Sequence, residues 1–333
     1  LEGRKAGKIG NVMATNYIAE KLKTYGIEPL SNSYLQEFTI FTDMSKNGAN
    51  EFLLDGPENL FEPIAYSLSG DIKDSEIAFV GFGITIPLND PKLKYDDYQN
   101  IDVKDKIVIV LTGDPGVGNA KSVFRDKDYI NYRSVFFKLK NAISHGAKGI
   151  ILVNDPLSLE NYPNEETPYF NTSEGSGNRF SILAGRATNH LINTKLKNSL
   201  TTLKIQQTIA KSQQPMSFML KSKGSMSVHL KKNTGRISNI VGVIKGTDPK
   251  FKDEVVVLGA HMDHLGYGGE SSMEPSRVKK IHNGADDNAS GTALVLKLAE
   301  KLSKKSLKRT HVFVLFNAEE MGLLGATYFV DTW

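Results

Sequence analysis

Two short apolar runs in the last third of the chain constrain the fold more than any other feature. Residues 255–258 and 312–316 are rich in valine, leucine and phenylalanine and do not alternate with polar residues. Such runs are typical of strands that are buried on both faces of a parallel sheet. Between them, apolar residues of 294–302 recur at helical spacing. The order predicts a strand–helix–strand unit, with Asn288 or Ser290 as the N-cap of the helix.

Side chains that can bind metal or carry protons follow these elements. His261 comes three residues after the first run, and Glu319 and Glu320 come just after the second. Asp286 and Asp287 open the helix between them. In open α/β sheets the ligands bind beyond the carboxyl ends of the strands. Imidazole nitrogen and carboxylate oxygen are ligands of zinc and similar dications, so the sequence predicts a metal site at this edge.

The spacing also suggests separate roles for these residues. A carboxylate from a loop can bridge two ions that lie about 3.5–4 Å apart. Of the paired glutamates, one can bind metal while the other takes a proton from a water molecule, whose pKa a metal lowers to about 7. Asp263, two residues after His261, is placed to orient the histidine ring. His264 is expected to lie in a loop or to support a ligand rather than to bind metal itself.

Three segments carry a resemblance to a known family. HMDHLG (261–266), GADDNASG (284–291) and NAEEMGLLGA (317–326) resemble the signature segments of the co-catalytic dizinc exopeptidases. This family includes bacterial leucyl aminopeptidases and glutamate carboxypeptidase II. The order also fits, because Asp287 follows His261 by 26 residues and Glu320 follows Asp287 by 33.

The resemblance implies a role for each matching residue. His261, Asp287 and Glu320 match metal ligands, with Asp287 as the bridging carboxylate of two zinc ions. Glu319 matches the general base, and Asp263 matches the carboxylate that supports His261. The family pattern has two more ligands, an Asp and a His, farther along the chain, whereas this sequence stops shortly after the glutamate pair. We therefore expect a fragment of a longer protein that holds three of the five metal-binding side chains.

The same resemblance predicts the domain organisation. The expected fold is α/β, with a mixed, mainly parallel sheet flanked by helices and an inserted β-rich module. KDKIVIVLTGD (104–114) and KLKNAISHGAKGIILVND (138–155) look like parts of a protease-associated domain. We expect this domain to cover residues 64–209. The peptidase domain would then be discontinuous, with residues 1–63 and 210–333.

Periodicity predicts further elements in both parts. Apolar spacing and a following glycine indicate helices over 8–25 and 135–145. Strands are expected at 35–41, 77–82, 107–111 and 149–153, and again within 216–246.

Composition excludes several classes of protein. The 333 residues are 40% hydrophobic and 23% charged, which is ordinary for a globular chain long enough for two domains. The net charge of +4 comes from scattered residues and does not call for nucleic acid. There is no apolar stretch of the roughly 20 residues that a membrane span needs. With no cysteine, disulfides and thiolate ligands are excluded.

The resemblance predicts hydrolysis of peptides at a chain end. Aminopeptidase activity on a peptide substrate is the leading expectation. Carboxypeptidase activity within the same family is the first alternative, because residues outside the motifs select the chain end. A non-catalytic, receptor-like relative and an inactive fragment are the others. A secreted or periplasmic location is expected from the family alone, and oligomeric state is left open.

Overall fold

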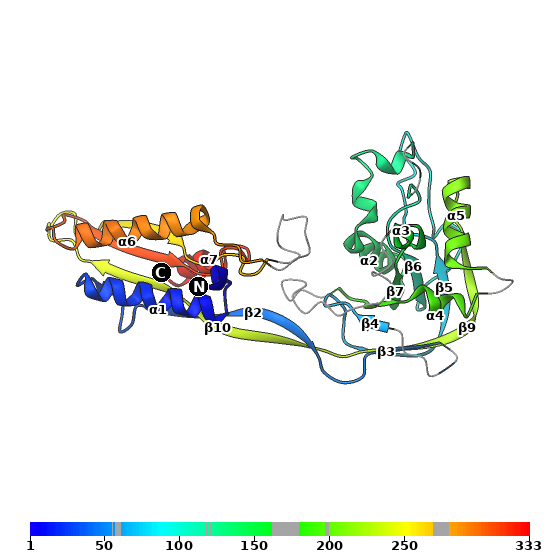
Figure 1. The fold of residues 1–333 in the computed structure, drawn as a ribbon, viewed down its shortest axis with the longest axis horizontal. Coiled ribbons are helices and arrows are strands. Elements are labelled where there is room, and N and C mark those ends of the chain that lie inside the picture. The colour runs from blue at the N-terminus through cyan, green and yellow to red at the C-terminus, as the bar shows by residue number, and fades with distance from the viewer. Residues whose placement is uncertain are drawn as a thin grey trace. The chain divides into compact units, whose positions relative to one another are not determined.

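The computed structural model describes residues 1–54, 56, 61–117, 119, 121–161, 180–196, 200–268 and 280–333. The chain divides into two compact units (Figure 1). Unit 1 consists of Leu1–Thr42 and Asn233–Trp333, and unit 2 consists of Asp43–Lys232. Each unit has a sheet of its own, with the expected mixture of strands and helices. The predicted α/β class is therefore confirmed.

Unit 1 contains the predicted strand–helix–strand unit. It runs from β11 (Val255–His261) through α6 (Gly291–Leu302) to β12 (Thr310–Phe316), and the two strands pair in parallel. The described sheet has the order β1-β10-β12-β11, and β2 also pairs with β10. Three strands complete it: β1 (Glu28–Pro29), β2 (Leu35–Lys46) and β10 (Leu230–Ile244). The pairs of β10 with β1 and with β12 are antiparallel, so this sheet is less parallel than expected.

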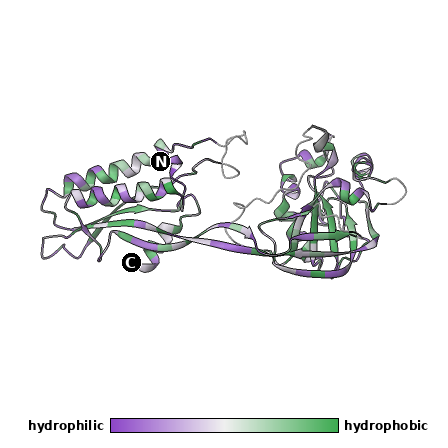
Figure 2. Ribbon diagram, turned by 60° about the horizontal axis from the view of Figure 1, so that its bottom comes forward, coloured by the Kyte–Doolittle hydropathy of each residue, from purple (hydrophilic) through white to green (hydrophobic). Residues whose placement is uncertain are grey.

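Helices cover both faces of this sheet. On one face α1 (Ile9–Thr24) and α6 share an apolar cluster with β10, β11 and β12, which includes Ile18, Val295 and Phe313. On the other face α7 (Leu324–Thr332) contributes Phe329 to a cluster with the valines of β10 and β12. Figure 2 shows two long helices along one side of the sheet and the C-terminal helix on the other. Burial of these faces supplies the main stabilisation of the unit.

The expected burial on both faces holds for β12 but is wrong for β11. Val312, Val314 and their neighbours in β12 are fully buried. In β11, by contrast, Val255 is 43% exposed and Val257 is 48% exposed. The reason is that the apolar cluster around α7 includes described residues of β10 and β12 but none of β11. Only the face of β11 that carries Leu258 and Ala260 packs against the α6 cluster.

Unit 2 is built on a second mixed sheet. Within the described residues its seven strands have the order β3-β9-β5-β6-β7-β8-β4. Neighbours from β5 to β8 pair in parallel, and the three outer pairs are antiparallel. The strands are β3 (Glu51–Leu54), β4 (Phe61–Pro63), β5 (Gly70–Val80), β6 (Ile107–Leu111), β7 (Gly149–Val153), β8 (Leu183–Ala187) and β9 (Ser217–Val228). The helices are α2 (Val135–Ser144), α3 (Pro156–Asn161), α4 (Asn189–Asn193) and α5 (Thr202–Ser212).

The boundaries of unit 2 differ from those expected. The sequence placed the inserted domain at 64–209, whereas the compact unit covers Asp43–Lys232. The difference arises because β3 and β9, which lie outside 64–209, pair with each other, and β9 also pairs with β5. Long-range pairing of this kind leaves no local signal in the sequence. That unit 2 is a protease-associated domain stays a prediction.

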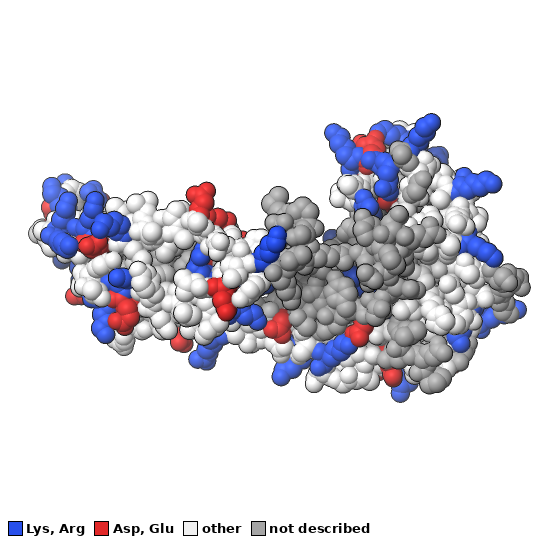
Figure 3. Space-filling view, in the orientation of Figure 1, with Lys and Arg blue, Asp and Glu red and all other residues white. Residues whose placement is uncertain are grey.

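The helices and strands predicted from the spacing of apolar residues in short stretches of the sequence are confirmed. The expected helices became α1 and α2, and the runs at 107–111 and 149–153 became β6 and β7. The strand expected at 35–41 continues to Lys46. No helix in the described part of the chain is both long enough and apolar enough to cross a membrane. On the face shown in Figure 3, acidic and basic side chains are interspersed.

Unit 2 buries several ionisable side chains, among them Asp97 and Lys138. The Asp97 carboxylate accepts hydrogen bonds from the backbone N–H groups of Phe82 and Ile84, each at 3.0 Å, and from the Tyr95 hydroxyl at 2.8 Å. The Lys138 Nζ donates to the carbonyl of Phe82. Burial raises the pKa of Asp97 to about 7 and lowers the pKa of Lys138 to about 7. Ionising the buried carboxyl group is therefore unfavourable.

We expect Asp97 to make the stability of unit 2 fall as the pH rises from about 4 to 7. In this range the carboxyl ionises in the unfolded chain (pKa about 3.9) but stays protonated in the folded unit. The loss amounts to about 4 kcal/mol at most. Lys138 is protonated in both states below pH 7, so it does not contribute. Asp97→Asn should remove this slope, while Asn in place of the exposed Asp105 should not; hydrogen exchange of β5 and β6 amides measures both. An unchanged slope in Asp97→Asn would contradict the assignment.

Candidate active site

The parallel pair β11 and β12 brings two loops to one edge of the sheet. His261, the last residue of β11, lies opposite Phe316, the last residue of β12. The Met262 N–H then donates to the Phe316 carbonyl at 2.9 Å, which ties the outgoing segments together. Residues 261–264 and 317–320 therefore leave the sheet side by side. Because the two strands are parallel, this edge is the one at which α/β proteins place their ligands.

Asp263 holds the backbone of the two glutamates in place. Its side chain is fully buried, and its two carboxylate oxygens accept the backbone N–H groups of Glu319 at 3.1 Å and Glu320 at 3.3 Å. Burial raises the pKa of Asp263, and the two N–H groups oppose that rise by stabilising the carboxylate. The Asp263 side chain thus connects the turn after β11 to the turn after β12.

His261 lies between the acidic groups. Its Nε2 is 2.9 Å from Asp287 Oδ1 and 3.8 Å from Glu319 Oε2. Its Nδ1 is 3.3 Å from the backbone oxygen of Asp263 and 3.8 Å from the Asp263 carboxylate. The ring is therefore oriented first by the carbonyl of Asp263, and the carboxylate expected to orient it lies farther away.

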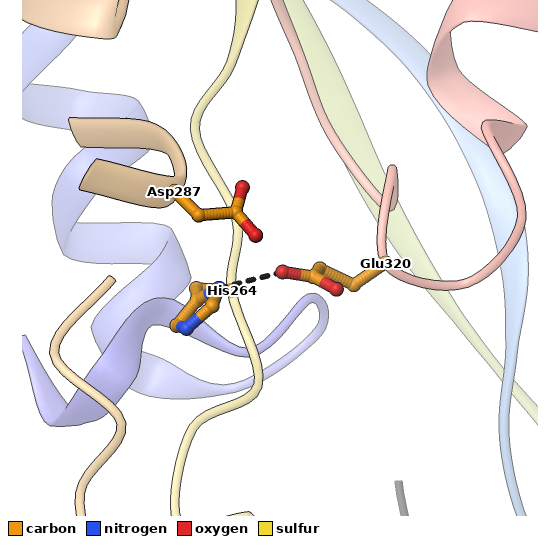
Figure 4. Close-up of side chains that lie close together, drawn as sticks. All are labelled: His264, Asp287 and Glu320. Atoms are coloured by element: carbon orange, nitrogen blue, oxygen red, sulfur yellow. Dashed lines mark hydrogen bonds and ion pairs between the residues drawn. The ribbon is translucent and has the colours of Figure 1, made fainter. Parts of the chain in front are cut away.

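His264 lies in the site, where the sequence did not predict a metal-binding group. Its Nδ1 is 2.6 Å from Glu320 Oε1, and both side chains are largely buried. Donor atoms of His264, Asp287 and Glu320 all lie within 4.8 Å of one another, and Figure 4 shows the three side chains converging. They come from the loop after β11, the turn before α6 and the loop after β12. A separation of 56 residues hides the contact between His264 and Glu320 from the sequence.

The turn before α6 presents Asp287. This turn, Ala285–Ser290, ends where Asn288 Oδ1 accepts the Gly291 N–H at 2.9 Å. Ser290 occupies the N-cap position of α6, but its hydroxyl donates to the Asp286 carbonyl at 2.8 Å, so the contact at the start of the helix comes from Asn288. The Thr292 hydroxyl donates to the His261 carbonyl at 2.9 Å and joins α6 to the end of β11. In this arrangement Asp287 Oδ1 lies 2.9 Å from His261 Nε2.

The donor set fits a divalent cation. Three carboxylates, of Asp287, Glu319 and Glu320, lie beside two imidazoles. Collecting carboxylates in a partly buried place is costly unless positive charge compensates them. Histidine nitrogen with carboxylate oxygen is the ligand chemistry of zinc sites. The structure brings together all five residues that the sequence singled out, and their individual roles stay predictions.

An N-terminal arginine braces two of the loops. The guanidinium of Arg4 donates to the carbonyls of Met262 at 2.9 Å, Asn283 at 2.8 Å and Gly284 at 3.0 Å. Its own carbonyl accepts the His264 N–H at 3.3 Å. Gly3 (φ +68°) makes this approach possible, because a Cβ there would lie 2.5 Å from the Gly266 carbonyl oxygen. Sequence reasoning missed Arg4, since its partners are more than 250 residues away.

We expect Arg4→Met to destabilise the loops around the site. The change keeps the length of the side chain but removes three hydrogen bonds from a charged donor, for a loss of about 2–4 kcal/mol. Amide hydrogen exchange at His264 and Gly266 should accelerate. Arg236→Met is the control, because Arg236 is 82% exposed and its nearest acidic group is 3.8 Å away. Equal protection of these amides in the Arg4 variant and the native chain would contradict the bracing role.

Asparagine side chains hold the start of the glutamate turn. Asn317, which is fully buried, exchanges two side-chain hydrogen bonds with Asn11 of α1, each 3.0 Å long. The Asn317 N–H donates to Asn239 Oδ1 at 3.0 Å, and the Asn239 amide donates to the Gly325 carbonyl at 2.8 Å. Buried amides are stable only when satisfied in this way. The segment that carries Glu319 and Glu320 is thus fixed to α1 and β10.

Comparison with known proteins agrees with this site. The model of Peptidase family M28 matches residues 239–333. Aminopeptidase YwaD of Bacillus subtilis is 28% identical over 250 residues, which cover 75% of this chain and 40% of that protein. A glutamate carboxypeptidase 2 homolog of Caenorhabditis elegans is 34% identical over 120 residues, which cover 34% of this chain and 13% of that protein.

Among solved structures, an aminopeptidase from Aneurinibacillus sp. strain AM-1 aligns with 20% identity and a TM-score of 0.49, over 99% of this chain and 62% of that one. The chain thus spans less than two thirds of the proteins that it resembles. The family match covers the acidic and imidazole side chains of this site. The part of the chain that carries the site, residues 239–333, is therefore the part that matches the model of Peptidase family M28.

Proposed function

We propose that the complete gene product is a zinc-dependent aminopeptidase that removes N-terminal residues from peptides. One observation carries the proposal. Asp287, Glu319 and Glu320 converge with two imidazoles at the carboxyl ends of two parallel strands, inside the segment that matches the peptidase family. The similarity to an aminopeptidase over 75% of the chain supports the choice of chain end.

Metal binding and proton transfer would fall to different residues. His261, Asp287 and Glu320 would hold zinc, and two ions are expected in the complete gene product. When bound, zinc acts as a Lewis acid toward a carbonyl group and lowers the pKa of water. Glu319, whose carboxylate lies 3.8 Å from His261 Nε2, would take a proton from the attacking water and deliver it to the leaving amine. Asp263 accepts the backbone N–H of Glu319 and so holds the turn that carries this residue.

The test compares substrates that differ only at one end. Leucine p-nitroanilide should be hydrolysed, and its N-acetyl derivative should not, because an aminopeptidase requires the free amino group. A chelator should remove activity and zinc should restore it. Hydrolysis of N-acetylated dipeptides instead would assign the carboxypeptidase alternative. Absence of both zinc and peptide hydrolysis in the complete gene product would support a receptor-like relative and contradict the proposal.

Two further parts of the proposal rest on the family resemblance. Unit 2 is proposed to be a protease-associated domain that shapes access of the substrate. Deleting it without changing peptide selectivity would contradict this role. The protein is also proposed to be secreted or periplasmic, and recovery of the native protein only from the cytoplasmic fraction would contradict that location.

A further inference from the structure

We propose that the end of unit 1 opposite the candidate active site docks on a bilayer that contains anionic phospholipids. The surface is formed by residues 245–254 and 300–309, which we call the basic end. These two segments hold eight Lys or Arg and four Asp or Glu, a balance of +4. The whole chain also has a net charge of +4, so the charges of all other residues cancel. The inference does not depend on the proposed function.

The fold brings the two segments of the basic end together, although they are separate in the sequence. The Thr247 N–H donates to the Leu307 carbonyl at 2.8 Å, and the Thr310 hydroxyl donates to the Lys252 carbonyl at 2.6 Å. Both signs of charge occur on the face drawn in Figure 3, but Lys and Arg prevail at the end of unit 1 where α6 ends. The fold thus concentrates a charge surplus that looks scattered in the sequence.

Most lysines of the basic end are not neutralised by a neighbouring carboxylate. Glu254 is paired with Arg309 at 2.6 Å. Glu300 lies 2.7 Å from Lys297 and 3.6 Å from Lys304. Among the described residues, five exposed lysines of this surface have no carboxylate at ion-pair distance: Lys250, Lys252, Lys301, Lys305 and Lys308. Two of its carboxylates are likewise unpaired, which leaves an excess of +3. Such an excess attracts anionic partners.

The end of α6 explains only part of this charge. A helix C-terminus stabilises cations within its last turn, and Lys301 lies there. Lys305 and Lys308, however, follow the helix, and Lys250 and Lys252 belong to the other segment. The excess is therefore a property of the whole surface rather than of one helix end.

The chemistry of the basic end fits a layer of lipid phosphates better than a nucleic acid. Lysine is a compact, hydrated charge that attracts phosphate without a fixed geometry, whereas arginine and free aromatic rings favour nucleic acids. Arg309 is already paired. The aromatic ring of this surface, that of Phe251, is covered, because Lys250 Nζ lies 5.1 Å and Arg309 Cζ 4.7 Å from its centre. A plane of head groups can be contacted by lysines of both segments at once.

Docking by the basic end would leave the candidate active site free. This surface adjoins the amino ends of β11 and β12, whereas His261 and Glu319 stand at or just beyond their carboxyl ends. β11 has seven residues, which corresponds to a length of about 20 Å. The edge that carries the acidic groups would therefore face away from the lipid.

Sedimentation of the complete gene product with vesicles tests the proposal. Vesicles of phosphatidylcholine and phosphatidylglycerol should retain the protein, whereas vesicles of phosphatidylcholine alone should not. Each lysine near an anionic bilayer strengthens binding about fivefold. The triple variant Lys301→Gln, Lys305→Gln, Lys308→Gln should therefore bind roughly 100-fold more weakly. High salt should release the native protein, because it screens exposed charges, and this arm needs no variant.

The matched control is the triple variant Lys140→Gln, Lys211→Gln, Lys221→Gln, which removes the same charge from exposed positions of unit 2. It should bind the vesicles as the native protein does. Equal losses in the two variants would assign the binding to net charge and contradict the proposal.

Three other outcomes would also overturn the proposal: no binding to the anionic vesicles, binding that survives high salt, and tighter binding to duplex DNA than to the vesicles. Hydrolysis of leucine p-nitroanilide is a separate readout. Its absence would contradict the proposed function and leave the docking surface untouched.

Discussion

Glu319→Gln should lower kcat of the complete gene product by about 10²–10⁴-fold while its zinc content stays unchanged. The amide keeps the shape of the side chain and leaves the backbone contact to Asp263 intact, but it cannot accept a proton from water. Since Glu319 lies beside His261 without being assigned as a ligand, the metal should remain. Steady-state hydrolysis of leucine p-nitroanilide and metal analysis of the same preparation measure both quantities.

Glu320→Gln is the matched comparison for this prediction. The two glutamates are adjacent, and both have their backbone N–H bound to Asp263. Only Glu320 contacts His264, however, and belongs to the group that can hold an ion. We expect its replacement to weaken zinc binding and thereby lower activity. Undiminished kcat in Glu319→Gln would remove Glu319 from the role of base.

Asp287→Ala should have the largest effect on metal binding. Asp287 lies near both imidazoles, at 2.9 Å from His261 and within 4.8 Å of the donor atoms of His264 and Glu320. Its removal deprives either ion of a ligand. We expect zinc affinity to fall by more than about 100-fold, beyond the effect of losing a supporting contact. Competition with a chromophoric chelator measures the change.

Asp286→Ala provides the control for this effect. Asp286 is the adjacent carboxylate in the same turn, and it is also exposed. It is absent from the group of described residues that can hold an ion. Its replacement should therefore leave zinc affinity within about twofold, a change of about 0.4 kcal/mol. If the two variants lose affinity equally, general electrostatics rather than ligation would explain the result.

The local part of the fold could be predicted from the sequence. The apolar runs that became β11 and β12 and the spacing that became α6 needed only neighbouring residues. The exposure of Val255 and Val257 depended instead on which strands the apolar cluster around α7 includes. The boundaries of unit 2 depended on the pairing of β3 with β9, which are far apart in the chain. Strands that pair over a long distance in the chain leave no pattern within a short stretch of sequence.

The same distinction applies to the site. His261, Asp287, Glu319 and Glu320 stand at strand and helix ends, so the sequence could place them at one edge. His264 stands in an irregular loop, and whether it faces Glu320 depends on the contacts of that loop with residues 3 and 4. Arg4 was missed for the same reason. The signal available in the sequence was a charged residue with Gly3 and Gly7 near it. In the structure both glycines have positive φ, which is typical of a tightly folded segment.

A crystal structure of the zinc-loaded protein, with anomalous differences collected at the zinc edge, tests the central claim most directly. The claim is that Asp287 and its neighbours form a metal site at the carboxyl ends of β11 and β12. The account predicts an anomalous peak about 2.0–2.2 Å from a carboxylate oxygen of Asp287, with Glu320 and an imidazole as further ligands. Zinc bound elsewhere, with Asp287 and Glu320 turned away from it, would contradict the account.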